Sequence, residues 1–150
     1  KLFSANHLRR SIFLPLLNVG DQGLFLLDFE VVHYGHPLFD IAFMLNHLIL
    51  KAIHNPLAMG SYIHSMQEYI RGYEEFWDIS SGRESLNLID SDELVKQIGC
   101  LMLARIDGKS PVEYIVNSTT QSVVRGIAKS IICGQHPDLN SVIALVSDEA

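Results

Sequence analysis

The residues best suited to chemistry are two carboxylates, Asp28 and Glu30, separated by one apolar residue. In an extended segment, side chains at positions i and i+2 point to the same side, so both carboxylates can face one point. Paired oxygen ligands of this kind suit Mg²⁺, which binds one or two carboxylates together with substrate phosphates and water. The same spacing also fits a strand that runs into a loop with both acids solvated. The spacing alone leaves these two interpretations open.

Three further polar residues follow this pair: His33, His36 and Asp40. Asp40 falls in the first turn of a predicted helix, where an acid compensates the partial positive charge of the helix N-terminus. It could also accept backbone N–H bonds and brace the loop that holds Asp28. The histidines follow neither the H-E-x-x-H pattern nor a Cys/His zinc pattern, so we expect ordinary surface or core histidines rather than a metal site.

The apolar pattern predicts the elements that must position these residues. Apolar runs at 14–19 and 24–29 flank a turn rich in glycine and aspartate, which predicts a β-hairpin whose second strand leads to Asp28. The segment from 38 to about 53 is apolar almost all round, which is typical of a central core helix. We therefore expect an α+β, mostly α fold, with an N-terminal β-hairpin followed by about five helices.

The other helices are predicted from their start and stop signals. Asp90 and Ser110 are candidate N-caps, the second followed by a proline at the first helical position. Asp138 is a candidate cap for the last helix, and Gly134 is a stop signal. The predicted helices span about residues 56–79, 94–106, 111–133 and 138–146.

Composition bounds the class of protein. The chain has 150 residues, of which 48% are hydrophobic and 19% charged, and its formal net charge is −6. This excludes intrinsic disorder and disfavours a nucleic-acid-binding protein, which would ordinarily be basic. The longest apolar run, 41–50, is interrupted by Asn46 and His47, so we expect no membrane span. Cys100 and Cys133 lack C-x-x-C spacing, and we expect them to be reduced and buried in a cytoplasmic protein.

Two stretches of the sequence carry a pattern that extends beyond the acid pair. The first consists of LLDFE at 26–30 and GHPLFDIA at 35–42, and the second is LARIDGKSPVEY at 103–114. The first is similar to the pattern I-D-F/W-E, a short spacer and G-D-P-x-x-D-L-A of the aminoglycoside phosphotransferase and choline kinase-like family. The second resembles the C-terminal part of bacterial members. The resemblance covers residues 15–150, and residues 1–14 form an unassigned leader that does not match.

The resemblance implies the C-terminal lobe of a protein-kinase-like fold and transfer of the γ-phosphoryl group of ATP to a hydroxyl group of a small molecule. Asp28 matches the Mg²⁺-binding acid of a D-F-G-like motif, Glu30 lies where a second acid helps to hold the metal, and Asp40 matches the acid that braces the catalytic loop. Mg²⁺ and ATP are the implied cofactors, because phosphoryl transfer depends on positioning and on charge neutralisation. A nucleic-acid partner or a membrane is not implied.

Several features depart from the family pattern. The family's catalytic loop reads H-G-D-x-x-x-x-N, whereas residues 9–18 read RRSIFLPLLN and contain no aspartate. Asn18 could stand in for the metal-binding asparagine, but no catalytic aspartate is identified. His36 replaces the aspartate of G-D-P. The nucleotide-binding N-terminal lobe is absent, so we expect a truncated chain with a degraded catalytic loop.

Two functions from different classes are therefore carried forward. The first is an ATP-dependent kinase acting on a small molecule. The alternative is a non-catalytic remnant that binds a small molecule, forms a homodimer through surface that the missing lobe would cover, or obtains this lobe from a partner. Binding of Mg²⁺ and nucleotide discriminates between them. An unrelated helical domain with a chance match is a third interpretation.

Overall fold

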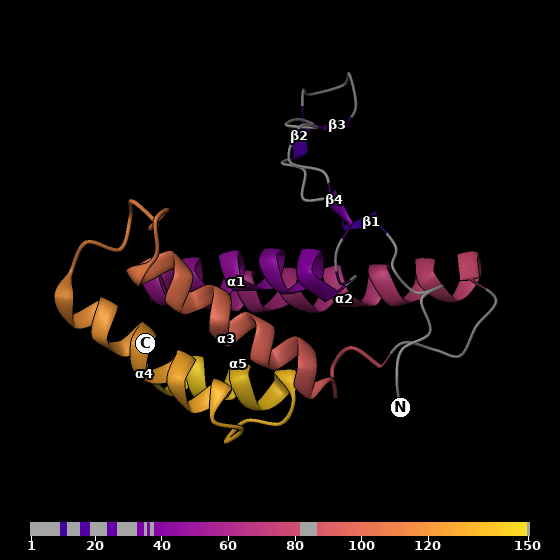
Figure 1. The fold of residues 1–150 in the computed structure, drawn as a ribbon. Coiled ribbons are helices and arrows are strands. Elements are labelled where there is room, and N and C mark those ends of the chain that lie inside the picture. The colour runs from indigo at the N-terminus through magenta and orange to yellow at the C-terminus, as the bar shows by residue number, and fades with distance from the viewer. Residues whose placement is uncertain are drawn as a thin grey trace. The chain divides into compact units, whose positions relative to one another are not determined.

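The computed structural model divides the chain into two compact units, Lys1–Asp40 and Ile41–Ala150 (Figure 1). Side chains are described for residues 36, 38–76 and 87–149. Backbone structure is described for residues 10–11, 16–18, 24–26, 33–34, 36, 38–81 and 87–149.

Four short strands form the described β structure of the first unit. They make two antiparallel pairs: β1 (Arg10–Ser11) with β4 (His33–Tyr34), and β2 (Leu16–Asn18) with β3 (Leu24–Leu26). The register of the second pair sets Asn18 opposite Leu24. Strands in globular proteins are ordinarily about five or six residues long, so strands this short offer little surface for a sheet to bury.

The predicted α+β fold class is wrong, because the second unit is a bundle of helices. Its core is built from helix faces and from the loops that join them. The β-hairpin predicted from apolar runs at 14–19 and 24–29 is not seen at that extent, and the described residues of that region show only a three-residue ladder. The expected kinase-like C-terminal lobe, a hairpin followed by helices, is corrected to a helical bundle. Amphipathic helices can bury their apolar stripes against one another without a sheet.

The helix α1 (Leu38–His54) buries eight of its residues, which confirms the expectation of a core helix. It ends before Asn55 and Pro56, as predicted, because proline disfavours helical conformation in the residue that precedes it. A short 3₁₀ helix, η4 (Pro56–Ala58), leads into α2 (Met59–Ser81), which runs back in the opposite direction (Figure 1). In the described part of the chain, no helix is both long and apolar enough to cross a membrane.

The helices α3 (Asp92–Asp107) and α4 (Ser118–Ile132) approach each other closely at a glycine. A Cβ atom at Gly99 would lie 3.0 Å from the carbonyl oxygen of Ala128 and equally close to two isoleucine side chains of α4. This separation is shorter than an ordinary van der Waals contact. The missing side chain therefore lets the backbones of α3 and α4 come together.

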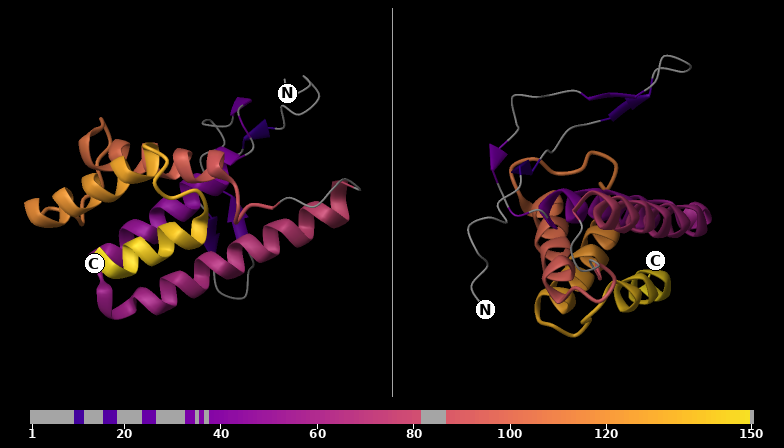
Figure 2. Two further views of the ribbon diagram at one scale, coloured as in Figure 1. Left: turned by 90° about the horizontal axis from the view of Figure 1, so that it is seen from below. Right: turned by 90° about the vertical axis from the view of Figure 1, so that its right-hand side faces the viewer.

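The last helix boundaries follow the signals predicted from the sequence. Gly134 has a φ of 77°, the left-handed conformation that glycine adopts readily, and it follows the end of α4. Its N–H and that of the next residue donate to carbonyl oxygens in the last turn of α4, which is the Schellman pattern. Asp138 caps α5 (Leu139–Glu149), because its carboxylate accepts the N–H of Ser141 at 2.8 Å. α5 then packs against α4 (Figure 2).

The start of α4 differs from the prediction. Its N-cap is Asn117 rather than Ser110, and the Asn117 side chain accepts the N–H of Thr119 at 2.8 Å. The intervening segment stays in a loop, where the N–H of Val112 donates to the carbonyl oxygen of Arg105 at 2.8 Å. The hydrogen bond between the loop and the end of α3 therefore overrides the local Ser-Pro signal for a helix start.

Two smaller predictions also need correction. The N-cap of α3 is Ser91, whose hydroxyl accepts a backbone N–H in the first turn, and not Asp90. Cys100 and Cys133 are free thiols, but both are exposed rather than buried. Cys100 follows the buried Gly99 and falls outside the buried stripe of α3, so helical periodicity places it on the solvent side.

Two helical glycines, Gly99 at the α3–α4 contact and the exposed Gly126, give a matched test of this packing. An added Cβ at Gly126, on α4, would meet nothing within 4 Å, so Gly126→Ala should stabilise the fold by about 0.5–1 kcal/mol through helix propensity. In Gly99→Ala, the close contact of the new Cβ with the Ala128 carbonyl oxygen should cancel this gain in helix propensity. The larger side chain of Gly99→Val should destabilise the fold by about 1–3 kcal/mol. Urea unfolding followed by circular dichroism measures both. Equal stabilisation by the two alanines would contradict the close approach of α3 and α4.

Candidate functional site

The acid pair of the predicted metal site, Asp28 and Glu30, lies outside the described residues. Asn18, the third predicted ligand, is the last residue of β2. Asp40 lies in the first turn of α1 and is half-buried. Asp40 thus occupies the position where an acid compensates the partial positive charge of a helix N-terminus.

His36 holds the start of α1. Its Nδ1 accepts the N–H of Leu38 at 3.3 Å, and its carbonyl oxygen accepts the N–H of Phe39 at 3.0 Å. The first N–H groups of a helix have no partner within the helix, and a side-chain acceptor is the usual way to satisfy them. An aspartate side chain could accept the same kind of bond. The imidazole of His36 therefore supplies a capping acceptor without a negative charge.

The second unit brings together polar side chains that the sequence pattern alone does not reveal as a group. We call them the Arg105 cluster: His47, Lys51, His54, Arg105 and Tyr114. The first three follow i, i+4 and i+7 spacing and so share one face of α1. Arg105 comes from the last turn of α3, and Tyr114 comes from the loop that follows. The helical spacing on α1 is the one signal in the sequence that points to this cluster.

Arg105 ties the end of α3 to the loop. Its Nη1 donates to the carbonyl oxygen of Ser110 at 2.7 Å and to the hydroxyl of the same residue at 3.2 Å. The carbonyl oxygen of Arg105 accepts the N–H of Val112. Its Nε, in contrast, is shielded from solvent and has no hydrogen-bond partner among the described residues. The Nη1 of Arg105 therefore has a structural role, whereas its Nε lacks a partner among the described residues.

Tyr114 lies against α1 with its hydroxyl group enclosed. Its ring centroid is 5.2 Å from that of His54. The hydroxyl is buried and has no hydrogen-bond partner in the described structure. Burial raises the pKa of Tyr114; the positive charge of Arg105 opposes this shift, and Tyr62 adds to it. A buried polar group without a partner ordinarily costs about 1–3 kcal/mol, so this hydroxyl calls for an explanation.

His47 lies close to the positive charges of this cluster. Burial lowers its pKa, and Arg105 and then Lys51 lower it further because they repel a second positive charge. Its ring also packs edge-on against Phe43, with the ring centroids 4.7 Å apart. His47 is therefore a neutral imidazole at neutral pH, able to donate one hydrogen bond and accept another.

Two further buried polar side chains lie in the helices that carry the cluster. Asn46 of α1 is fully buried, and neither its amide nitrogen nor its amide oxygen has a hydrogen-bond partner among the residues that the structure describes. The side-chain oxygen of Gln97, on α3, is also buried without a partner. The core of the second unit is otherwise apolar. Unpaired polar atoms are thus concentrated in α1, α3 and the loop after α3.

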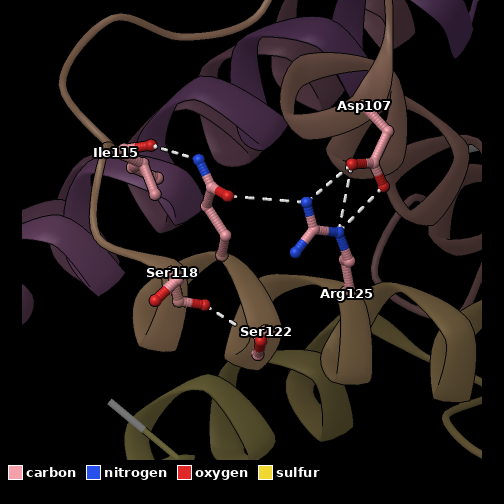
Figure 3. A network of polar contacts seen from close by, with 6 residues as sticks. Asp107, Ile115, Ser118, Ser122 and Arg125 are labelled. Atoms are coloured by element: carbon pink, nitrogen blue, oxygen red, sulfur yellow. Dashed lines mark hydrogen bonds and ion pairs between the residues drawn. The ribbon is translucent and has the colours of Figure 1, made fainter.

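Figure 3 shows the polar network that fixes this loop to α4. The Nε and Nη2 of Arg125 donate to the two carboxylate oxygens of Asp107 over 2.7–3.1 Å. Gln121 accepts a bond from Arg125 and donates to the carbonyl oxygen of Ile115 at 3.0 Å. The hydrogen bond from Arg125 holds the pKa of Asp107 below its ordinary value. The network fixes the backbone next to Tyr114 relative to both helices.

No three histidine, cysteine, aspartate or glutamate side chains within the described ranges gather into a metal site. Comparisons of the chain with protein-family models, with curated proteins and with solved structures return no match. The case for a function therefore depends on the sequence motifs and on the geometry described above.

The capping role of His36 predicts how substitutions there affect stability. His36→Ala removes the acceptor for the Leu38 N–H, and we expect a loss of about 0.5–2 kcal/mol in the free energy of unfolding. His36→Asp restores an acceptor at a helix N-terminus and should remain close to the natural protein. Chemical denaturation measures both variants. Equal destabilisation by alanine and aspartate would exclude a capping role.

The lowered pKa of His47 predicts a pH dependence with a definite sign. The unfolded chain binds a proton at this residue more readily than the folded protein does. The folded protein should therefore lose stability as the pH falls below about 6.5, the ordinary histidine pKa. Arg105→Gln and Lys51→Gln should each raise the pKa of His47, because each removes a positive charge. NMR titration of the imidazole C–H resonances measures this pKa.

Arg71→Gln is the control for this titration, because Arg71 lies exposed on α2 in an ion pair with Glu68. It removes the same charge from a residue that does not contribute to the shift of the His47 pKa, so it should leave that pKa unchanged. An unchanged pKa in both Arg105→Gln and Lys51→Gln would contradict the electrostatic account.

Proposed function

We propose that the chain is a cytoplasmic phosphotransferase of the aminoglycoside phosphotransferase and choline kinase-like family, which uses ATP to phosphorylate a hydroxyl group of a small molecule. The observation that carries the proposal is the order of its motifs, LLDFE at 26–30 followed by GHPLFDIA at 35–42. The exposed thiols Cys100 and Cys133 are unpaired, which supports a reducing compartment.

The start of α1 gives the second motif a physical meaning. Within GHPLFDIA, His36 caps the helix and Asp40 lies in its first turn. Ile41 and Ala42 are almost fully buried. The motif thus combines a cap, an acid for the helix dipole and the first core contacts, which supports its role in anchoring the chain that follows the acid pair.

The chemistry would fall to residues of the first unit. The carboxylates of Asp28 and Glu30, with the amide oxygen of Asn18, are the oxygen donors that Mg²⁺ prefers. When bound, the metal ion neutralises phosphate charge during the transfer. Asp40 would brace the segment that holds Asp28. Because residues 9–18 contain no aspartate to orient the acceptor hydroxyl, we expect a rate orders of magnitude below that of a complete kinase.

A second candidate function is a non-catalytic module that binds a small molecule. The observation that favours it is the Arg105 cluster, in which Arg105 Nε and the Tyr114 hydroxyl are buried and have no partner in the described part of the chain. Buried polar groups without partners are more typical of ligand-binding sites than of ordinary protein cores. This function needs no catalytic aspartate and no nucleotide.

A thermal-shift measurement with Mg²⁺ and ATP tests the kinase proposal. A ligand at about ten times its Kd stabilises the native state by about 1.4 kcal/mol, which raises the melting temperature by a few degrees in a chain of this size. We expect a rise that requires both Mg²⁺ and ATP. Asp28→Ala should abolish this rise, and Glu30→Gln should reduce it.

Asp148→Ala is the matched control, because Asp148 is an exposed acid in the last turn of α5. It should keep the full response to Mg²⁺ and ATP. A rise that survives in Asp28→Ala would place the nucleotide elsewhere and contradict the assigned metal site. No rise at millimolar nucleotide would contradict the kinase proposal and favour the binding module.

A further inference from the structure

We propose that the Arg105 cluster binds a small oxyanion, the carboxylate or phosphate group of a small molecule. Its buried atoms without partners include the Nε–H of Arg105 and the hydroxyl of Tyr114, both of which can donate hydrogen bonds. Lys51 and His54 are exposed beside them on the same face of α1. The proposal does not rest on the kinase activity, because Asp28 and Glu30 are not part of this site.

The free edge of Arg105 has the geometry that recognises an oxyanion. Ser110 takes up Nη1 alone, through its carbonyl oxygen and its hydroxyl. The edge formed by Nε and Nη2 is therefore left for another partner. Arg125 uses this same edge in the present structure to hold both carboxylate oxygens of Asp107. Bidentate pairing of this kind is the strongest interaction that arginine makes with carboxylates and phosphates.

The charge balance of the cluster favours an anion over a neutral ligand. Arg105 and Lys51 each carry a positive charge, and within the described ranges no carboxylate forms a hydrogen bond or an ion pair with either of them. A trapped water molecule could satisfy the hydroxyl of Tyr114, but it carries no negative charge to pair with the half-buried Arg105. An oxyanion satisfies both requirements at once.

Access to the site follows from the exposure of its members. Arg105, Tyr114 and His47 are half-buried, whereas Lys51 and His54 are exposed. The ring of exposed His54 packs on that of Tyr114, so an outward rotation of His54 would uncover this side of Tyr114. Exposed side chains change rotamer rapidly, so this movement is compatible with fast binding.

NMR of the complete chain tests the proposal directly. Inorganic phosphate and acetate are titrated separately into ¹⁵N-labelled protein at constant ionic strength, which is maintained with sodium chloride. We expect the Nε–H resonance of Arg105, assigned by its loss in Arg105→Lys, to shift in a saturable manner. The Nε–H resonances of Arg71 and Arg125 should not move, because both guanidinium groups already pair with carboxylates. The stronger of the two titrations shows whether the site prefers phosphate or carboxylate.

Two variants and a control complete the test. Tyr114→Phe keeps the ring that packs on His54 and removes only the hydroxyl, so it should weaken anion binding about tenfold or more. Arg105→Gln should abolish binding, and Arg71→Gln should leave it unchanged. No saturable shift with either anion, or equal affinity in the natural protein and in Tyr114→Phe, would overturn the proposal. Because Asp28→Ala leaves this site intact, failure of anion binding and failure of Mg²⁺–ATP binding are distinguishable.

Discussion

The close approach of α3 and α4 at Gly99 sets the geometry of the helical unit. With no side chain at this position, the backbone of α3 comes close to the carbonyl oxygen of Ala128. The spacing that results brings the end of α3 within reach of Arg125, which holds Asp107 with two nitrogen atoms. The loop between the two helices must then return over a short distance, and this return places Tyr114 against α1. The polar cluster is thus a consequence of the helix–helix contact.

In this arrangement, the cost of buried polar atoms opposes the stabilisation that a largely apolar core provides. The buried apolar residues of α1, α3, α4 and α5 supply the hydrophobic stabilisation. Against this, Asn46, Arg105 and Tyr114 hold polar atoms away from water without partners, at an ordinary cost of about 1–3 kcal/mol for each group. Apolar residues of similar size would avoid that cost. The Arg105 cluster, which brings two of these groups, Arg105 and Tyr114, against one face of α1, is more consistent with a role in binding than with packing alone.

Sequence reasoning succeeded where the signal is local and failed where it depends on tertiary contacts. The extent of α1, the left-handed Gly134 and the cap at Asp138 follow from nearest-neighbour chemistry. The start of α4 could not be predicted, because the bond from Val112 to Arg105 keeps a Ser-Pro signal in a loop. The Arg105 cluster was equally hidden, since one helix contributes its histidines and distant segments contribute its arginine and tyrosine. The extent of the β-hairpin was overestimated, because apolar runs of six residues can form strands of only three residues.

In the proposed phosphotransferase, the histidine at position 36, where the resembling motif has aspartate, separates structural from chemical demands on the first unit. A helix cap needs an acceptor, which an imidazole nitrogen supplies to Leu38 as an aspartate could. A metal ligand for Mg²⁺ needs a hard, negatively charged oxygen, which an imidazole does not supply. A position that tolerates histidine is therefore one where the hydrogen bond matters more than the charge. In the proposed phosphotransferase, the requirement for negative charge would then fall on Asp28 and Glu30, so removal of either carboxylate should impair the proposed metal binding without affecting the start of α1.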